Sequence, residues 1–132
     1  MGRLVDSGIV IIMKKYLISI LFFAFLSCQN SAVINTEDAV ILLNNNDYYF
    51  LDVRTPIEHK EKSIPATQCI PLNEIEQRLG ELEPYRNKKI IVYCRSGNRS
   101  SRATEILRES GFDAINLLGG MNHWKGEVVL GK

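Results

Sequence analysis

The stretch KKIIVYCRSGNRS, residues 88–100, decides the fold of this chain. It contains four consecutive apolar residues, Ile90 to Tyr93, which are typical of a strand buried on both faces at the centre of a parallel sheet. A helix is predicted to follow from Ser100 to Ser110, because apolar residues recur there at helical spacing. Cys94 therefore lies where a central strand ends and a helix is about to begin.

The segments on either side of this stretch alternate between strand and helix patterns. Further strands are predicted at Tyr48–Val53, Cys69–Ile70 and Ala114–Leu118. Helices are predicted from Thr36 to about Leu43 and, capped by Asn73, over Glu74–Leu82. Gly111 suits the left-handed position after the helix that ends at Ser110, and Gly119-Gly120 lead into a short helix that carries Trp124. This alternation predicts an α/β fold.

Length and composition limit the possible functions. The chain has 132 residues, of which 45% are hydrophobic, and a formal net charge of +1. That length suits one compact domain and is too short for two. The balanced charge gives no electrostatic reason to expect nucleic acid as a partner. The only two histidines, His59 and His123, do not form a cluster with ligand spacing, so no metal site is predicted.

The N-terminal segment has the pattern of an export signal. Lys14-Lys15 precede the apolar run Tyr16–Leu26, which is too short for a comfortable membrane span of ~20 residues. The run ends at Ser27-Cys28, which resembles a bacterial lipoprotein signal in which Cys28 is lipidated and becomes the new N-terminus. A cleaved soluble export, an uncleaved membrane anchor and a buried helix of the domain remain alternatives.

This interpretation divides the chain into three parts. Residues 1–27 are expected to be an N-terminal extension and signal peptide, residues 28–35 a tether, and residues 36–132 the domain. The protein is then expected to be exported to the bacterial cell envelope, anchored in the membrane through lipid on Cys28, and to face the periplasm.

The loop that begins at Cys94 has the composition of an anion-binding site. Backbone N–H groups at a strand-to-helix junction lack partners, and the helix dipole adds positive charge there. Arg95, Arg99 and Arg102 add full charges, so the pKa of Cys94 is expected to lie well below the free value of ~8.5. Gly97 lets the backbone close around an anion. Cys94 is thus predicted to be a nucleophile that attacks an anionic substrate and forms a covalent intermediate.

Two other interpretations of Cys94 compete with this one. Cysteine-dependent phosphatases space the cysteine and arginine as Cys-x5-Arg, whereas here the spacing is Cys94-x4-Arg99 and the next position is Ser100. The shorter loop suits a sulfur atom better than a tetrahedral phosphate. Inert buried cysteines are common, but they do not require two arginines within six residues.

Three segments together resemble the rhodanese family, over residues 33–132. Residues 51–59, LDVRTPIEH, look like its first signature, and residues 94–100, CRSGNRS, are similar to its active-site loop. Residues 117–124, LLGGMNHW, resemble its C-terminal signature. Residues 62–69 depart from the family pattern, because Lys62-Ser63 replace the usual Gly-His and Ala66-Thr67 the usual Gly-Ala. These positions bear on the choice of acceptor.

The resemblance implies a fold and an activity. The fold would be an α/β domain with about five mostly parallel strands and helices on both faces. Cys94 would take a sulfane sulfur from a small anionic donor such as thiosulfate, hold it as a persulfide, and pass it to a cyanide-like acceptor or to a thiol, such as a protein thiol. No metal or organic cofactor is implied. The substrate would be bound by the remainder of the loop: Arg95, Ser96, Gly97, Asn98 and Arg99.

Four other residues have both a functional and a structural interpretation. Asp52 and Arg54 are expected to support the site by orienting the loop, or else to stabilise the fold as an ion pair, and Glu58 has the same two possibilities. Cys69 could form a disulfide with Cys94, which would make the protein a thiol redox protein, or could be a small buried hydrophobe. A binding module that presents a persulfide or thiol without turnover is a further alternative.

Overall fold

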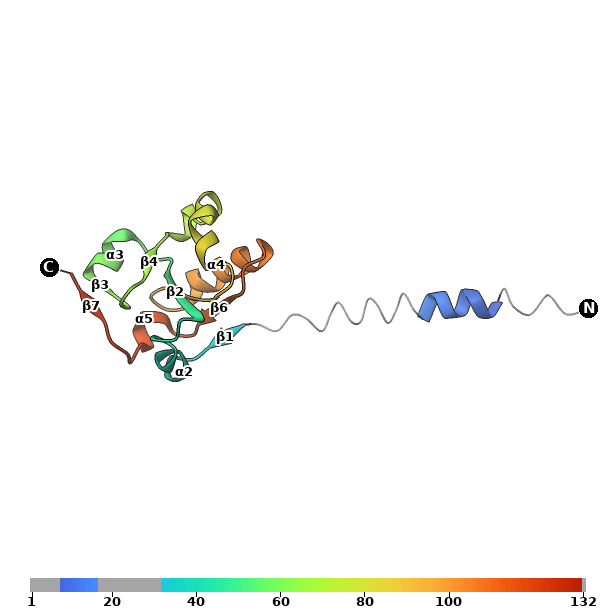
Figure 1. Ribbon diagram of the computed structural model, residues 1–132, viewed down its shortest axis with the longest axis horizontal. Helices are drawn as coiled ribbons and strands as arrows, with labels where there is room; N and C mark the ends of the chain where they lie inside the picture. The colour runs from blue at the N-terminus through green and yellow to red at the C-terminus, as the bar shows by residue number, and fades with distance from the viewer. Residues whose placement is uncertain (1–7, 17–31, 132) are drawn as a thin grey trace, which may run out of the picture. The chain divides into compact units, whose positions relative to one another are not determined.

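The computed structural model describes residues 8–16 and 32–131, and the chain divides into two units, Met1–Ser31 and Ala32–Lys132 (Figure 1). In the first unit, residues 8–16 are helical. Cys28 and most of the apolar run predicted as a signal lie outside the described residues. None of the helices in the described part is both long enough and apolar enough to cross a membrane.

The second unit is built on a five-stranded sheet in which every pair of neighbouring strands is parallel, with the order β1-β6-β5-β2-β4. The predicted strand at the centre is β5, Lys89–Tyr93, and residues Ile90 to Tyr93 are completely buried. The other strands are β1 (Val33–Ile34), β2 (Tyr48–Asp52), β4 (Gln68–Cys69) and β6 (Ala114–Leu117).

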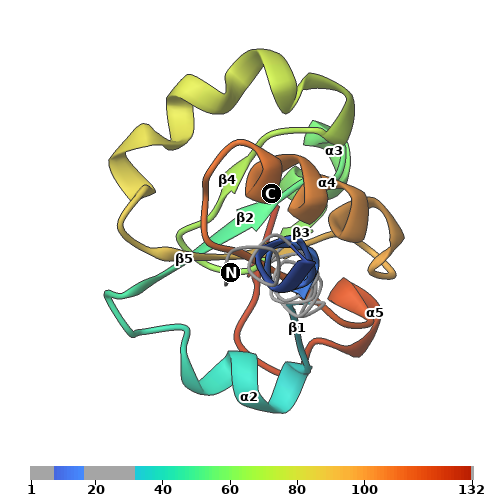
Figure 2. The same ribbon diagram turned by 90° about the vertical axis from the view of Figure 1, so that its right-hand side faces the viewer.

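Alternate residues of β5 pack on opposite faces of this sheet. Ile90 and Val92 belong to a core that includes residues of the helix α4, Asn98–Glu109. Ile91 and Tyr93 belong to a second core with residues of α2 (Thr36–Ile41) and α5 (Gly120–His123). Figure 2 shows α2 and α5 on one side of the strands and α4 on the other. The fold is therefore α/β, with a parallel five-stranded sheet and helices on both faces, as predicted.

The predicted helix over Glu74–Leu82 is wrong in type. The segment instead forms 3-10 helices, η1 (Leu72–Glu74) and η2 (Glu76–Tyr85). Pro84 lies inside η2. In an α-helix its ring would clash with the carbonyl group four residues earlier, at Gly80, which is itself a weak helix former. The tighter i to i−3 bonds seen here, such as Arg78 N–H to the Ile75 carbonyl at 3.2 Å, avoid that geometry.

The expected tether over residues 28–35 also needs correction. Val33 and Ile34 form β1, which pairs with Asn116 and Leu117 of β6. Asn35 caps α2 by accepting the N–H of Asp38 at 2.8 Å, a role that had been predicted for Thr36. The domain therefore begins at the edge strand, and residues 33–35 are part of it.

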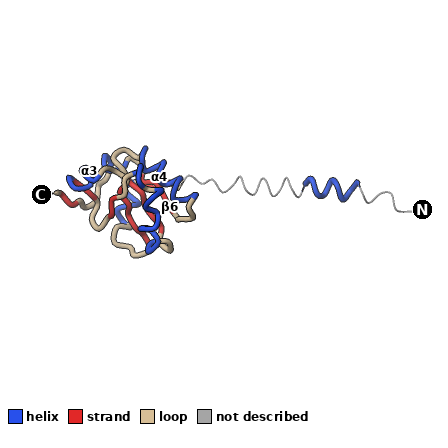
Figure 3. Tube along the Cα trace, turned by 90° about the horizontal axis from the view of Figure 1, so that it is seen from above, coloured by secondary structure: helices blue, strands red, loops and turns tan. Residues whose placement is uncertain are grey.

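A second, two-stranded sheet was not expected. β3 (Lys62–Ser63) and β7 (Val129–Leu130) are antiparallel. They lie beside α3, Pro56–Glu61, which begins with a capping box between Thr55 and Glu58. The N–H of Gly131, just after β7, donates to the carbonyl of Glu61, the last residue of α3, at 3.1 Å, and Figure 3 shows α3 close to the C-terminal end of the chain.

Candidate active site

Cys94 follows β5 directly, and 1% of its surface is exposed. The backbone N–H of Gly97 donates to Cys94 Sγ at 3.1 Å, and Ser100 Oγ lies 3.3 Å from the same sulfur. Gly97 is in the left-handed region, with φ of +102°, and it precedes the first residue of α4. The loop thus bends back over the sulfur, and α4 starts two residues earlier than the sequence predicted.

The pKa of the Cys94 thiol is lowered from its ordinary value, in the direction that the sequence predicts. Burial raises this pKa, but hydrogen bonds from the Ser100 side chain and from the backbone of Ser100, Gly97 and Ser96 outweigh it. Of the three effects that the sequence predicts, the loop N–H groups, the helix dipole and the arginines, the hydrogen bonds of the loop and of the first turn of α4 are therefore the main cause of the lowered pKa.

The helix α5 packs against the backbone of the active loop and donates hydrogen bonds to it. The N–H groups of Met121 and Asn122 donate to the carbonyl oxygens of Cys94 and Arg95, at 2.9 and 3.0 Å. A side chain at Gly120 would overlap the Cys94 carbonyl oxygen and approach the Arg95 carbonyl group to 2.9 Å. Gly120 also has a φ of +51°. Glycine at this position lets the last signature pack directly against the loop.

The arginines of the loop are placed differently from one another. Arg99 donates two hydrogen bonds to Glu58 of α3, at 2.9 and 2.8 Å, and this contact lowers the pKa of Glu58 to about 2. Arg102 is paired with Glu105 at 3.0 Å. Arg95 is exposed, and no carboxylate partner for it is found in the described part of the chain. Of the two arginines predicted to bind a donor, Arg95 is thus free to do so, whereas Arg99 is held by Glu58.

Asp52 and Arg54 form a buried ion pair, with Arg54 Nη2 2.7 Å from Asp52 Oδ2. Arg54 also donates to the Lys62 carbonyl at 2.6 Å, and His59 Nδ1 lies 2.9 Å from Asp52 Oδ2. These contacts join β2 to α3 and β3. Among the described residues, none of the hydrogen bonds of this pair reaches residues 94–99, so its placement fits the structural interpretation.

Cys69 lies too far from Cys94 to form a disulfide in this structure. Cys69 pairs with Asp52, which pairs in turn with Tyr93, so two strand spacings of ~4.8 Å separate Cys69 from the strand that leads to Cys94. A disulfide needs Cα atoms within about 7 Å. Burial, followed by the charge of Asp52, also raises the pKa of Cys69 to about 11. The thiol redox alternative has no support in this geometry.

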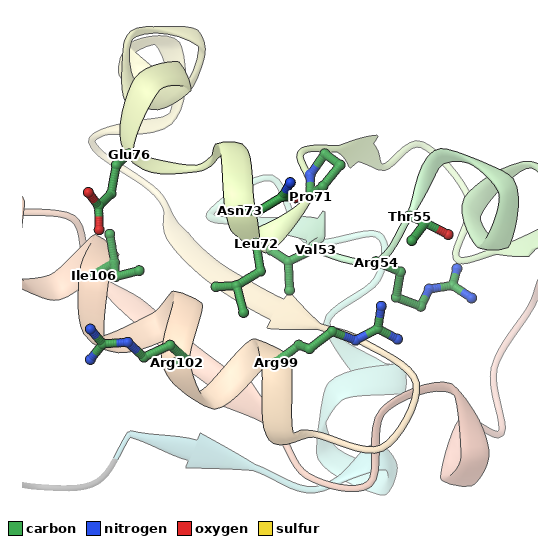
Figure 4. A pocket seen from close by; sticks show the side chains of 10 residues that line it. All are labelled: Val53, Arg54, Thr55, Pro71, Leu72, Asn73, Glu76, Arg99, Arg102 and Ile106. Atoms are coloured by element: carbon green, nitrogen blue, oxygen red, sulfur yellow. The ribbon is translucent and has the colours of Figure 1, made fainter.

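A cavity of about 510 Å³ lies on the face of the sheet that α4 covers. Arg99, Arg102 and Ile106 line it from α4, while Leu72 and Asn73 line it from η1 (Figure 4). Val53, which lines it too, packs in the same apolar core as Cys94. The described residues include no cluster of three or more histidine, cysteine or acidic side chains that could hold a metal ion.

Two residues near Cys94 were missed in the sequence, Asn116 and the hydroxyl of Ser100. Ser100 Oγ donates to Asn116 Oδ1 at 2.6 Å, and Asn116 Nδ2 donates to the Gly97 carbonyl at 3.3 Å. Asn116 is the polar residue within the apolar strand β6, and 6% of its surface is exposed. A buried amide in a central strand was the signal that could have drawn attention to it.

Comparison with known proteins gives a consistent result. The family model described as "Rhodanese-like domain" matches residues 35–127. The "Adenylyltransferase and sulfurtransferase MOCS3" of Arabidopsis thaliana is 36% identical over 113 residues, which cover 74% of this chain but 24% of that protein. The "Thiosulfate sulfurtransferase PspE" of Escherichia coli (strain K12) is 33% identical over 73 residues, 55% of this chain and 70% of the relative.

A solved structure shares the fold. The rhodanese-like domain protein from Staphylococcus aureus superimposes with a TM-score of 0.68 at 29% sequence identity. The match covers 76% of this chain and 98% of that one.

Proposed function

This chain belongs to the rhodanese-like domain family, whose members include sulfurtransferases, and from that premise we propose that Cys94 carries a sulfane sulfur as a persulfide. The observation that carries the proposal is the environment of Cys94 Sγ. It lies at the end of the central strand, beneath a loop whose Gly97 N–H points at it. The family resemblance supplies the reaction class, and this contact supports Cys94 as the residue that performs it.

The first half of the reaction loads the cysteine. The Cys94 thiolate attacks the outer, sulfane sulfur of a donor such as thiosulfate. A new S–S bond forms to Cys94, the S–S bond of thiosulfate breaks, and its electron pair leaves with sulfite. The product is a persulfide whose negative charge lies on the outer sulfur, where backbone N–H groups of the loop can stabilise it.

The second half returns the enzyme to its starting state. A thiophilic acceptor, such as cyanide or a thiolate, attacks the outer sulfur and forms a bond to it. The S–S bond to Cys94 breaks, and its electron pair returns to Cys94 as thiolate. Neither half requires a metal or a redox cofactor, because every electron pair moves between sulfur atoms and the acceptor.

Arg95 is the side chain best placed to attract an anionic donor. It is exposed on the loop, whereas Glu58 already neutralises Arg99. A donor anion near Arg95 would also feel the positive end of α4, which starts at Asn98. Arg95 is therefore proposed as the main electrostatic contact of the donor.

The proposal is tested by thiocyanate production from thiosulfate and cyanide, with the purified protein and its Cys94→Ser variant side by side. Turnover by the first and none by the second is expected. A persulfide on Cys94 without thiocyanate production would identify a protein-specific sulfur carrier. Neither persulfide nor turnover would reject the proposal.

We further propose that the protein is exported and anchored in the bacterial envelope through lipid on Cys28. Lys14-Lys15, the apolar run after them and Ser27-Cys28 support this, in the order that a lipoprotein signal requires. Intact mass of the protein extracted from membranes tests it. A chain that starts at Cys28 and carries acyl groups is expected, and a chain without acyl mass would contradict the anchor.

A further inference from the structure

Four buried hydrogen-bonding contacts form a closed ring around Cys94. The ring runs from Cys94 Sγ to Ser100 Oγ at 3.3 Å, and from Ser100 Oγ to Asn116 Oδ1 at 2.6 Å. It continues from Asn116 Nδ2 to the Gly97 carbonyl at 3.3 Å, and from the Gly97 N–H back to Cys94 Sγ at 3.1 Å. Ser100 is completely buried, and 6% of the surface of Asn116 is exposed. Water therefore cannot readily replace a bond that the ring loses.

The chemistry of the ring determines where its protons lie. The Gly97 carbonyl only accepts, so the amide group of Asn116 must turn its NH2 toward Gly97 and its oxygen toward Ser100. That oxygen also only accepts, so the single hydroxyl proton of Ser100 must point at Asn116. Ser100 therefore presents only a lone pair to Cys94, and the contact of 3.3 Å is satisfied when the Cys94 thiol donates its S–H.

Ionisation of Cys94 changes this arrangement. Once the thiol proton has left to water, the sulfur and Ser100 Oγ would face each other as two acceptors. The Ser100 hydroxyl can remove the conflict by rotating its proton onto the sulfur, and it then gives up its short bond to Asn116. The sulfur and the Asn116 amide thus compete for one proton.

We propose that Asn116 is a positioning residue that opposes ionisation of Cys94, because it holds the Ser100 hydroxyl proton away from the sulfur. Asn116 acts through Ser100 and does not touch Cys94. The inference rests on the proposed function only in taking Cys94 as the nucleophile. The Gly97 N–H and the Ser100 hydroxyl still stabilise the thiolate, but donation by Ser100 costs its short bond to Asn116, so the stabilisation is smaller than a free hydroxyl would give.

Substitution of Asn116 with leucine provides the test, because leucine has a similar size and no hydrogen-bonding group. The rate of Cys94 alkylation by iodoacetamide is measured against pH, without any sulfur donor. We expect the midpoint of the alkylation rate against pH to be about one pH unit lower in Asn116→Leu than in the wild type. That shift corresponds to the free energy of about one ordinary hydrogen bond. At pH values below both midpoints, alkylation should be roughly tenfold faster than in the wild type.

The same substitution in a Ser100→Ala background is the matched control. Without the Ser100 hydroxyl proton, Cys94 Sγ and the Asn116 amide have no proton to compete for. Asn116→Leu should therefore leave the midpoint of the alkylation rate unchanged in the Ser100→Ala background. The charged and titratable side chains on the elements around Cys94 are the same in all four proteins. They include Arg95 of the loop, Arg99 and Arg102 of α4, Tyr93 of β5, Glu58 and His59 of α3, Asp52 at the end of β2, Arg54 just after it, and His123 of α5.

The outcomes separate the proposal from a purely structural role. An unchanged or raised midpoint in Asn116→Leu, or an equal shift in both backgrounds, would overturn it. If the Asn116→Leu variant does not fold, the proposal is tested on the wild-type protein by nuclear magnetic resonance. The carboxamide ¹³C signal of Asn116 should then titrate together with Cys94 and stay constant in Cys94→Ala, and a signal that does not follow Cys94 would overturn the proposal. Because no sulfur donor is used, these results do not depend on whether the protein transfers sulfur.

Discussion

Gly120 is the position at which one added methyl group should do the most damage to the site. An alanine Cβ there would overlap the Cys94 carbonyl oxygen and lie 2.9 Å from both the carbonyl carbon and oxygen of Arg95. These atoms belong to the backbone of the active loop, so they cannot move aside as the end of a side chain can. The φ of +51° adds a second penalty, because residues with a side chain rarely adopt it.

The steric overlap and the positive φ both contribute to the destabilisation expected for Gly120→Ala. A methyl group forced into a packed site costs about 1–3 kcal/mol, and a left-handed residue with a side chain costs about 1–2 kcal/mol. We therefore expect Gly120→Ala to lower the free energy of unfolding by roughly 3 kcal/mol. For a domain of this size that corresponds to a fall in Tm of about 10 °C or more.

Thermal unfolding followed by circular dichroism measures this effect, and Gly80→Ala is its matched control. Gly80 has open space around its Cα and no positive φ, so its substitution should change the stability by less than about 1 kcal/mol. Loop displacement by Gly120→Ala should also slow alkylation of Cys94. A Gly120→Ala protein as stable as Gly80→Ala would show that α5 does not press against the loop, and the account of the last signature would be wrong.

Three further predictions concern the side chains around the loop. Because Arg99 lowers the pKa of Glu58 from 4.5 to about 2, the pair stabilises the protein above pH 4.5, and that contribution is lost as the pH falls toward 2. Acid unfolding of Glu58→Gln should lack this component, and an unchanged profile would refute the pair's contribution. Arg95→Ala should reduce kcat/KM for thiosulfate by roughly twofold to tenfold, more at low salt, whereas Arg102→Ala, already paired with Glu105, should have less effect; equal losses would argue against Arg95 as the donor contact. Cys69, with its pKa raised to about 11, should alkylate far more slowly than Cys94 near neutral pH, and Cys69→Ser should leave thiocyanate production unchanged, so that a large loss would reopen a role for the second thiol.

Much of the central architecture could be predicted from local patterns. The run Ile90 to Tyr93 has the composition of a doubly buried strand, and the structure buries all four residues. Gly111, predicted at the left-handed position after a helix, has a φ of +86°. These features depend on residues that are neighbours in the sequence, and local chemistry is sufficient to predict them.

Other features depend on partners that are distant in the sequence. Glu58 and Arg99 are 41 residues apart, and only the fold shows that they pair rather than leaving Arg99 free for a substrate. The strands β1, β3 and β7 have two residues each, too few to show any alternation. The helix predicted over Glu74–Leu82 had suitable apolar spacing, but Pro84, just beyond it, and Gly80 favoured the tighter 3-10 geometry.

The mass of the peptide that contains Cys94, measured after the protein has reacted with thiosulfate under non-reducing conditions, tests the central claim most directly. The account predicts that the peptide gains the mass of one sulfur atom, that cyanide removes this atom as thiocyanate, and that Cys69 gains nothing. A peptide of unchanged mass, or a sulfur atom found on Cys69 instead, would contradict the claim that the loop after β5 is built to hold a persulfide on Cys94.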